Sequence, residues 1–175
     1  MRKGILLFCA FVLLLTQGCT RPETLRLGEH PFGKTAFTAE IRGAKGGGEF
    51  TAKIGISPTD GDTCVRIEYI APDTLAGITV EARCQEDGTL SGEAEILRAG
   101  TSERLDAENL EGLLSPVSRL LKLAEHTAVQ KEGELYTLQF ANDITVKVNE
   151  AGDLLSYKDS DLQYEVIWLE RRETS

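Results

Sequence analysis

Apolar and polar residues alternate with a period of two along much of the chain between residues 35 and 170. Phe37, Ala39 and Ile41 show the pattern first, with Thr38 and Glu40 between them. Such alternation is typical of strands with one buried face and one solvated face. It predicts about nine antiparallel strands, over residues 37–42, 50–56, 65–69, 78–84, 89–98, 135–140, 144–148, 155–157 and 162–168.

The spacing of apolar residues changes to three and four after Ser115-Pro116. A serine followed by a proline is typical of a helix N-cap and its first helical position. We therefore expect a helix over residues 116–126, with a preceding helical turn near Leu110. Its apolar face consists of Val117, Leu120, Leu121, Leu123 and Ala124.

One helix has to bury that face against the sheet. The predicted fold is mainly β with one main helix (α+β): a strongly curved antiparallel sheet, or half-barrel, that wraps the helix. We expect it to form a single domain over residues 35–170, followed by a polar tail over 171–175.

The first residues have the pattern of an export signal. Arg2 and Lys3 precede a twelve-residue apolar run, Gly4 to Leu15. As a helix this run would extend roughly 18 Å, which is well short of the ~30 Å hydrocarbon core of a bilayer. A cleaved signal peptide over residues 1–18 therefore fits better than a permanent membrane span.

The end of this run, Leu15-Thr16-Gln17-Gly18-Cys19, resembles a bacterial lipobox. That resemblance implies cleavage between Gly18 and Cys19, and acyl chains such as palmitate on Cys19. Thr16 departs from the lipobox pattern, which has leucine three residues before the cysteine. The alternative is a secretory signal cut nearby, with Cys19 left as an ordinary thiol. Residues 19–34 then form the lipidated cysteine and a flexible tether.

Charge limits the surfaces that the domain could bind. The chain has 19 basic and 28 acidic residues. Without Arg2 and Lys3, 17 basic and 28 acidic residues remain, a net charge of −11. Such a domain is expected to repel nucleic acids and anionic lipid surfaces, so the lipid on Cys19 would be its membrane anchor. We expect it outside the cytoplasm, on the cell membrane or, if the organism has one, the outer membrane.

The combination of a lipobox, a short tether and a curved sheet around one helix resembles the half-barrel lipoproteins. These include the carrier and receptor of lipoprotein sorting (the Lol system) and small uncharacterised lipoproteins of Gram-positive bacteria. The turn from Pro72 to Val80, Pro-Asp-Thr-Leu-Ala-Gly-Ile-Thr-Val, is similar to one in the last group. The resemblance implies an apolar cavity for acyl chains between the helix and the concave face.

Cys64 and Cys84 flank one predicted hairpin symmetrically. Opposed residues on neighbouring strands come within reach of a disulfide, and an extracytoplasmic domain is exposed to oxidation. The alternation, however, places Cys84 on the apolar face and Cys64 on the other one. The alternatives are a disulfide, or Cys84 as a small core residue with Cys64 at the start of a strand.

Candidate chemistry is sparse. Neither Gly-x-Ser-x-Gly nor His-Glu-x-x-His occurs, and the two histidines, His30 and His126, are too scattered for a zinc site. We expect no catalytic residue, no metal and no cofactor. Aromatic residues lie on or beside the apolar strand faces, where they either pack the core or line a ligand pocket: Phe37, Phe50, Tyr69, Tyr136, Phe140, Tyr164 and Trp168.

The sequence therefore favours a non-catalytic, membrane-anchored lipoprotein that binds an apolar ligand, such as a lipid, or a lipidated partner. The second hypothesis is a protein interaction or sensor module that uses a sheet edge or the acidic face. The third, which has the least support, is a hydrolase.

Overall fold

The computed structural model describes residues 36–59, 62–85, 90–96, 101–103, 107–123 and 126–171. They form one sheet and one helix, α3 (Ala107–Leu121). The strands are β1 (Phe37–Lys45), β2 (Gly48–Pro58), β3 (Asp62–Ala71), β4 (Ile78–Gln85), β5 (Leu90–Ile96), β6 (Thr101–Glu103), β7 (Ala128–Glu132), β8 (Leu135–Gln139), β9 (Thr145–Asn149), β10 (Leu154–Lys158) and β11 (Leu162–Arg171).

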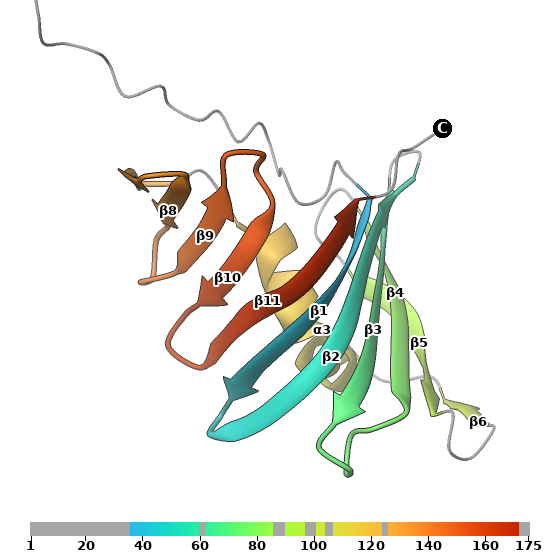
Figure 1. Ribbon diagram of the computed structural model, residues 1–175. Coiled ribbons are helices and arrows are strands. Elements are labelled where there is room, and N and C mark those ends of the chain that lie inside the picture. Colours follow the sequence, from blue (N-terminus) through green and yellow to red (C-terminus); the bar gives the residue numbers. More distant parts are fainter. Residues whose placement is uncertain are drawn as a thin grey trace, which may run out of the picture.

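The described strands form an open antiparallel sheet in the order β6-β5-β4-β3-β2-β1-β11-β10-β9-β8-β7. The chain starts in the middle of this sheet and proceeds by hairpins to one edge. It then crosses to the opposite edge through α3 and returns to the middle, where β11 pairs with β1. Figure 1 shows the sheet curving around α3, which lies behind it in this view. The predicted class, mainly β with one helix and a large antiparallel sheet, is confirmed.

We call the face of the sheet that packs against α3 the inner face, and the opposite one the outer face. The alternation decides which residues lie on each, because successive strand residues point to opposite sides. Ile41, Ile54 and Ile67 lie on the inner face and are 0–1% exposed. The outer face carries charged residues, such as Arg42, Lys53 and others described below.

The helix buries its apolar stripe in the same core. Leu110, Leu114, Val117 and Leu120 recur at spacings of three and four and are 0–2% exposed. The helix begins at Ala107 and ends at Leu121, so the predicted range of 116–126 was wrong at both ends, whereas the helical turn expected near Leu110 is part of α3. Ser115-Pro116 lies inside the helix instead of starting it, and both residues are buried.

Two of the eleven strands were missed by the prediction of about nine. Both are edge strands: β6 has the sequence Thr-Ser-Glu, and β7 has Val129 as its only large apolar residue. An edge strand needs little buried surface, so neither contains the alternation that would have revealed it.

The connection between the first two predicted strands, 37–42 and 50–56, is also shorter than predicted. β1 continues to Lys45, and only Gly46 and Gly47, both with positive φ, form the turn to β2. Gly43 lies within β1 directly opposite Tyr164. A Cβ atom at Gly43 would lie 2.1 Å from the Gln163 carbonyl oxygen, so a close approach of β11 explains this glycine.

Candidate functional site on the outer face of the sheet

The space between α3 and the sheet is filled. A side chain that lined an open cavity would keep exposed surface, whereas Leu114, Leu138, Val146, Val148 and Tyr157 are each 0–1% exposed. These residues come from the helix and from the β7–β10 half of the sheet. Among the described residues, the inner face therefore shows closely packed side chains instead of an open space for an acyl chain.

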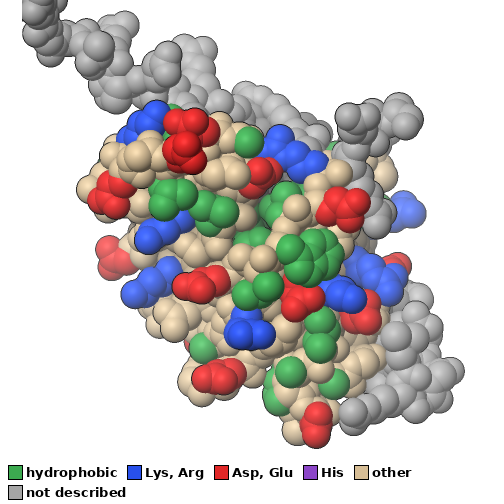
Figure 2. Space-filling model, viewed as in Figure 1, with side chains coloured by type: hydrophobic (Ala, Val, Ile, Leu, Met, Phe, Trp, Pro, Cys, Tyr) green, Lys and Arg blue, Asp and Glu red, His purple; other side chains and the backbone are tan. Residues whose placement is uncertain are grey.

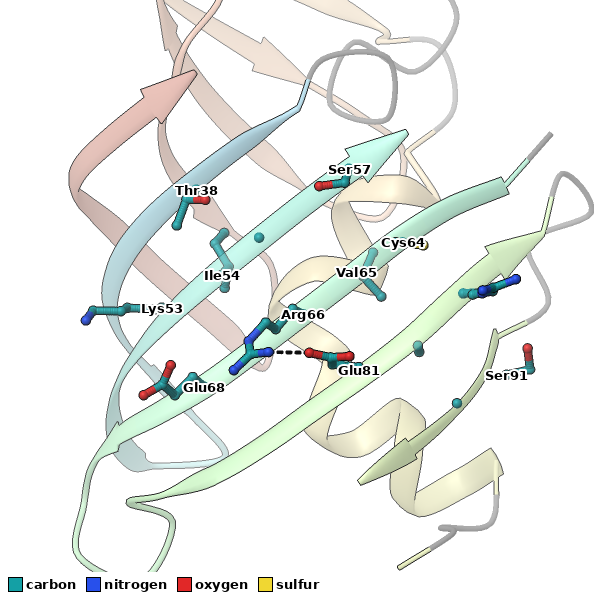
Figure 3. A pocket seen from close by; sticks show the side chains of 14 residues that line it. Thr38, Lys53, Ile54, Ser57, Cys64, Val65, Arg66, Glu68, Glu81 and Ser91 are labelled. Carbon is teal, nitrogen blue, oxygen red and sulfur yellow. Dashed lines mark hydrogen bonds and ion pairs between the residues drawn. The ribbon is translucent and has the colours of Figure 1, made fainter. Parts of the chain in front are cut away.

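The first of two hollows on the outer face has a volume of about 810 Å³ and lies over β2, β3 and β4. In Figure 3 the side chains of Lys53, Arg66, Glu68 and Glu81 lie on the near side of the sheet, with α3 behind. Gly55 faces Thr38 and Arg66 on the neighbouring strands, so its missing side chain helps to form the hollow. The charged residues that line it are Lys53, Arg66, Glu68, Glu81 and Arg83.

Arg66 and Glu81 lie opposite each other on β3 and β4 and form an ion pair. Their side chains are 52% and 62% exposed, so this pair contributes little to stability. Lys53 has no ion pair within the described part of the chain. The first hollow is thus a polar, mixed-charge surface.

The second hollow has a volume of about 740 Å³ and lies over β1, β2, β9, β10 and β11. Its charged side chains are those of Arg42, Lys147, Lys158, Glu49 and Glu165. Thr51, Thr145, Ser156 and Gln163 add hydroxyl and amide groups. Three cations and two carboxylates thus share this hollow with four neutral polar side chains, and the first hollow has the same balance of charges.

Large apolar side chains are exposed where β-bulges interrupt the pairing. The register of β3 against β2 omits Ile70, and that of β11 against β1 omits Ile167. Ile70 and Ile167 are 42% and 50% exposed. After the second bulge, Trp168 pairs with Glu40 and its indole N–H donates to the Glu40 carboxylate at 3.1 Å.

This bulge corrects the interpretation of Trp168, which strict alternation placed with the inner aromatic residues. One extra residue reverses the side to which the chain points, so Trp168 is 40% exposed on the outer face. Strict alternation over the predicted strand 155–157 also placed Leu155 on the same face as Tyr157, and this was wrong for the same reason. A bulge omits it from the pairing of β10 with β9, and Leu154 is the buried residue. Figure 2 shows apolar, acidic and basic side chains intermixed across this face.

Side chains from the sheet hold the helix by its carbonyl groups near Pro116. A proline has no N–H to donate to the carbonyl four residues earlier, here that of Gly112. Lys45 Nζ donates to the Gly112 oxygen at 2.7 Å, and Ser115 Oγ donates to it at 3.0 Å. Tyr69 Oη donates to the Leu113 oxygen at 2.7 Å. Tyr164 Oη similarly donates to the Pro116 oxygen at 2.8 Å.

A second set of polar contacts joins the far end of α3 to the β10–β11 turn. Arg119 donates to Asp159 at 2.5 Å and to Asp161 at 3.0 Å. Asp159 also accepts from the Tyr157 hydroxyl at 2.9 Å and from the backbone N–H groups of Asp161 and Leu162. Both carboxylate oxygens of Asp159 thus accept hydrogen bonds, which is typical of a structural anchor.

These contacts shift the pKa values of the groups involved. Burial alone would raise the pKa of Asp159, but the hydrogen bonds from Asp161, Leu162, Arg119 and Tyr157 lower it to about 2. Burial raises the pKa of Tyr69 to about 12. Burial also lowers the pKa of Lys45, with the nearby Arg119 charge acting in the same direction.

The residues predicted as sites are only partly described. Gly18 and Cys19, like the signal peptide and the tether, lie outside the described residues. Cys64 lies opposite Arg83, and Cys84 lies opposite Thr63, so the two cysteines point to opposite faces and are not bonded to each other. Both side chains are half-buried, so Cys84 is not a fully buried core residue.

His126 lies beyond the end of α3, and its ring packs edge-on against Phe140 at a centroid distance of 6.4 Å. Among the described residues, no group of three or more histidine, cysteine or acidic residues is placed to hold a metal ion. No helix in this part of the chain combines the length and apolarity that a membrane span requires.

The sequence predicted only part of the second hollow. Alternation assigns Arg42 and Lys147 to polar strand faces, but it does not reveal that β1 and β9 lie near each other in the sheet. Their proximity depends on the pairing of β1 with β11, whose residues are more than 100 positions apart. The Arg119–Asp159 contact was missed because it joins α3 to a turn that is 40 residues away in the sequence.

No protein-family model matches this chain, and no curated protein matches it. Two solved structures are similar in fold. A putative outer membrane lipoprotein-sorting protein domain from Vibrio parahaemolyticus has 9% identity and a TM-score of 0.49, over 81% of this chain and 87% of that one. An uncharacterized conserved protein from Thermus thermophilus has 12% identity and a TM-score of 0.47, over 81% of each chain. Both similarities concern the fold alone.

Proposed function

We propose that this protein is a lipid-anchored, extracytoplasmic domain that binds a partner without catalysing a reaction, and that its outer face is the binding surface. The position of the two hollows carries the proposal. Both lie on the outer face, while the inner face is filled by side chains of α3 and the sheet. The exposed Ile70, Ile167 and Trp168 add apolar contact area to that surface.

The anchor is the acylated Cys19. With a net charge of −11 after removal of the signal, the domain has no electrostatic reason to remain on an anionic membrane. Cys19→Ser should move the protein from the membrane pellet to the soluble fraction. Cys9→Ser is the matched control, because Cys9 leaves with the signal peptide and its loss should not change the fractionation. A Cys19→Ser protein that stays in the pellet would refute the anchor.

The binding surface can be tested by photo-crosslinking in cells. A photoreactive phenylalanine derivative at Trp168 or at Ile70 would report contacts of the outer face. The same group at Lys122, an exposed residue just after α3, is the control on the helix side. Discrete adducts from Trp168 or Ile70 and none from Lys122 are expected. Adducts from Lys122 alone would place the partner on the helix side and would contradict an outer-face binding surface.

A second candidate is an apolar ligand, such as a lipid, between α3 and the sheet. The observation in its favour is that α3 and the inner face form one continuous apolar surface, which displacement of the helix would open. Titration of a fluorescent fatty acid into the Cys19→Ser protein discriminates lipid binding from partner binding on the outer face. The filled interior predicts no saturable signal. A saturable signal that depends on inner-face residues would favour the lipid-binding function.

A further inference from the structure

The second hollow contains three cations that have no carboxylate partner. Arg42, Lys147 and Lys158 are exposed and line the hollow, and none of them forms an ion pair within 4.0 Å in the described part of the chain. Among the other described cations, Arg66, Arg119, Lys122, Lys131 and Arg171 form such pairs, whereas Lys45, Lys53 and Arg83 do not. Unpaired cations that share a hollow in an acidic protein suggest that an anion completes the site.

The strand register brings these cations together in two adjacent rows across the outer face. The first row runs Lys147, Ser156, Glu165, Arg42 and Thr51, each residue opposite the next. The second row contains Thr145, Lys158, Gln163, Ala44 and Glu49. Lys147 and Lys158 are diagonal neighbours on β9 and β10, roughly 7–8 Å apart at their backbones. Their flexible side chains can therefore reach one anion.

Neutral hydrogen-bond donors lie next to Lys147 and Lys158. Ser156 lies between Lys147 and Glu165, and Thr145 and Gln163 lie on either side of Lys158. Within the described residues, the side chains of Ser156, Thr145 and Gln163 form no hydrogen bond with another protein group. They remain available to an acceptor-rich ligand, and a phosphate group presents several acceptor oxygens.

The two carboxylates limit the charge of the site without cancelling it. Glu165 lies opposite Arg42, and Glu49 lies at the end of the second row, which leaves a formal charge of +1 for the five charged side chains. Lys147 and Lys158 have no carboxylate directly opposite. Charges elsewhere on the domain are largely screened beyond about 8 Å at physiological ionic strength. A single phosphate can thus be attracted where a long polyanion would be repelled.

We propose that the second hollow binds a phosphate group, with Lys147 and Lys158 as its charged ligands. The inference rests on the proposal that the outer face is the binding surface, and it names the chemistry of the ligand. The group could be presented by a glycerophosphate-type head group in a membrane or by a soluble phosphate compound. A volume of about 740 Å³ exceeds that of one phosphate, so part of an attached alcohol also fits.

The test uses the Cys19→Ser protein and titrates it with inorganic phosphate and with glycerol phosphate, followed by amide chemical shifts at constant ionic strength. Saturable shifts of Ser156 and of the residues next to Lys147 and Lys158 are expected. Lys147→Gln and Lys158→Gln should each weaken the affinity by about fivefold to tenfold, the loss expected for one charge-assisted hydrogen bond at a solvated site. Lys53→Gln changes the net charge equally but lies in the first hollow, so it should change the affinity less than about twofold.

A second arm identifies the source of the phosphate. Sedimentation with phosphatidylglycerol vesicles, compared with phosphatidylcholine vesicles, tests a head group in a membrane. Binding to the anionic vesicles that is weakened by Lys147→Gln or Lys158→Gln assigns the ligand to a lipid head group. Binding of glycerol phosphate alone assigns it to a soluble compound.

The inference is overturned if no arm shows saturable binding, or if Lys53→Gln weakens it as much as Lys147→Gln does. If no phosphate compound binds but crosslinks from Trp168 and Ile70 are still formed, only the phosphate inference is refuted. The outer face then remains the binding surface. Loss of both would remove the proposed function as well.

Discussion

At some positions in this sheet, the close approach of a neighbouring backbone determines which residue type fits. Gly43 shows this most clearly, because β11 passes directly over its Cα atom where Tyr164 stacks on Tyr157. The two rings lie 5.4 Å apart at an angle of 12°, and Tyr157 is 1% exposed. Any atom added at Gly43 has to displace the backbone that positions this pair.

Gly43→Ala should therefore destabilise the domain by about 1–3 kcal/mol, the usual cost of overpacking a tight site. The new Cβ would lie 2.1 Å from the Gln163 carbonyl oxygen and 2.5 Å from Tyr164 Cβ. Gly55→Ala is the matched control, since a Cβ there would meet Arg66 Cβ at 3.8 Å, an ordinary contact. Urea denaturation of both variants measures the difference. Equal stabilities would show that β11 can move away without cost.

The helix as an element depends on groups that belong to the sheet. Pro116 removes one hydrogen bond from the interior of α3, and the Gly112 oxygen accepts instead from Lys45 on β1 and from the Ser115 hydroxyl. The charged donor comes from a residue 67 positions away in the sequence, so the local pattern did not predict a helix that continues through Ser115-Pro116. That dipeptide led to a predicted start at residue 116, whereas the helix begins at Ala107.

A double-mutant cycle tests this compensation. Lys45→Met should cost about 1–2 kcal/mol in the presence of Pro116, because the Gly112 oxygen loses its charged donor. In a Pro116→Ala background the new N–H of residue 116 can donate to that oxygen, and the cost of Lys45→Met should fall by about 1 kcal/mol. The free energy of unfolding of all four proteins gives the coupling. A cost that is the same in both backgrounds would mean that Lys45 does not compensate for the proline.

The strands were more predictable than the helix, and the reason is physical. Each buried strand needs one apolar face, which leaves a period of two in the sequence, as at Phe50 to Ile56. The edge strands β6 and β7 need no such face, and bulges at Ile70, Leu155 and Ile167 change the phase without a local signal. The outer face therefore contained the residues that sequence alone could not place, Trp168 among them.

At the scale of the whole molecule, the two halves of the sheet meet where β1 pairs with β11, and α3 spans them. The helix contacts β3, β4 and β5 on one side. On the other side Arg119 binds Asp159 and Asp161 in the β10–β11 turn. The Asp159 side chain is only 8% exposed, whereas that of Arg119 is 32% exposed, so the charge state of Asp159 is the part of this link that should affect global stability most.

The stability of the protein should consequently fall in acid in a way that depends on Asp159. The pKa of this carboxyl is lowered from 3.8 to about 2 in the folded state, so the charged form is favoured by folding. A lowered pKa contributes stability that is fully present above the unfolded value, near pH 4. That contribution is lost as the pH falls through about 2. The difference corresponds to about 2 kcal/mol.

Asp159→Asn removes the ionisable group and leaves Arg119 without its buried partner. The variant should be less stable at pH 7 by about 2–4 kcal/mol, and it should lose less stability than the parent protein between pH 5 and pH 2. Asp143→Asn is the control, because Asp143 lies in an exposed turn and its positive φ of 59° suits asparagine equally well. Urea midpoints measured across this pH range distinguish the Asp159→Asn variant from the Asp143→Asn control. If Asp159→Asn and the parent protein lose stability in parallel with falling pH, Asp159 is not the charge that holds the helix to the second half of the sheet.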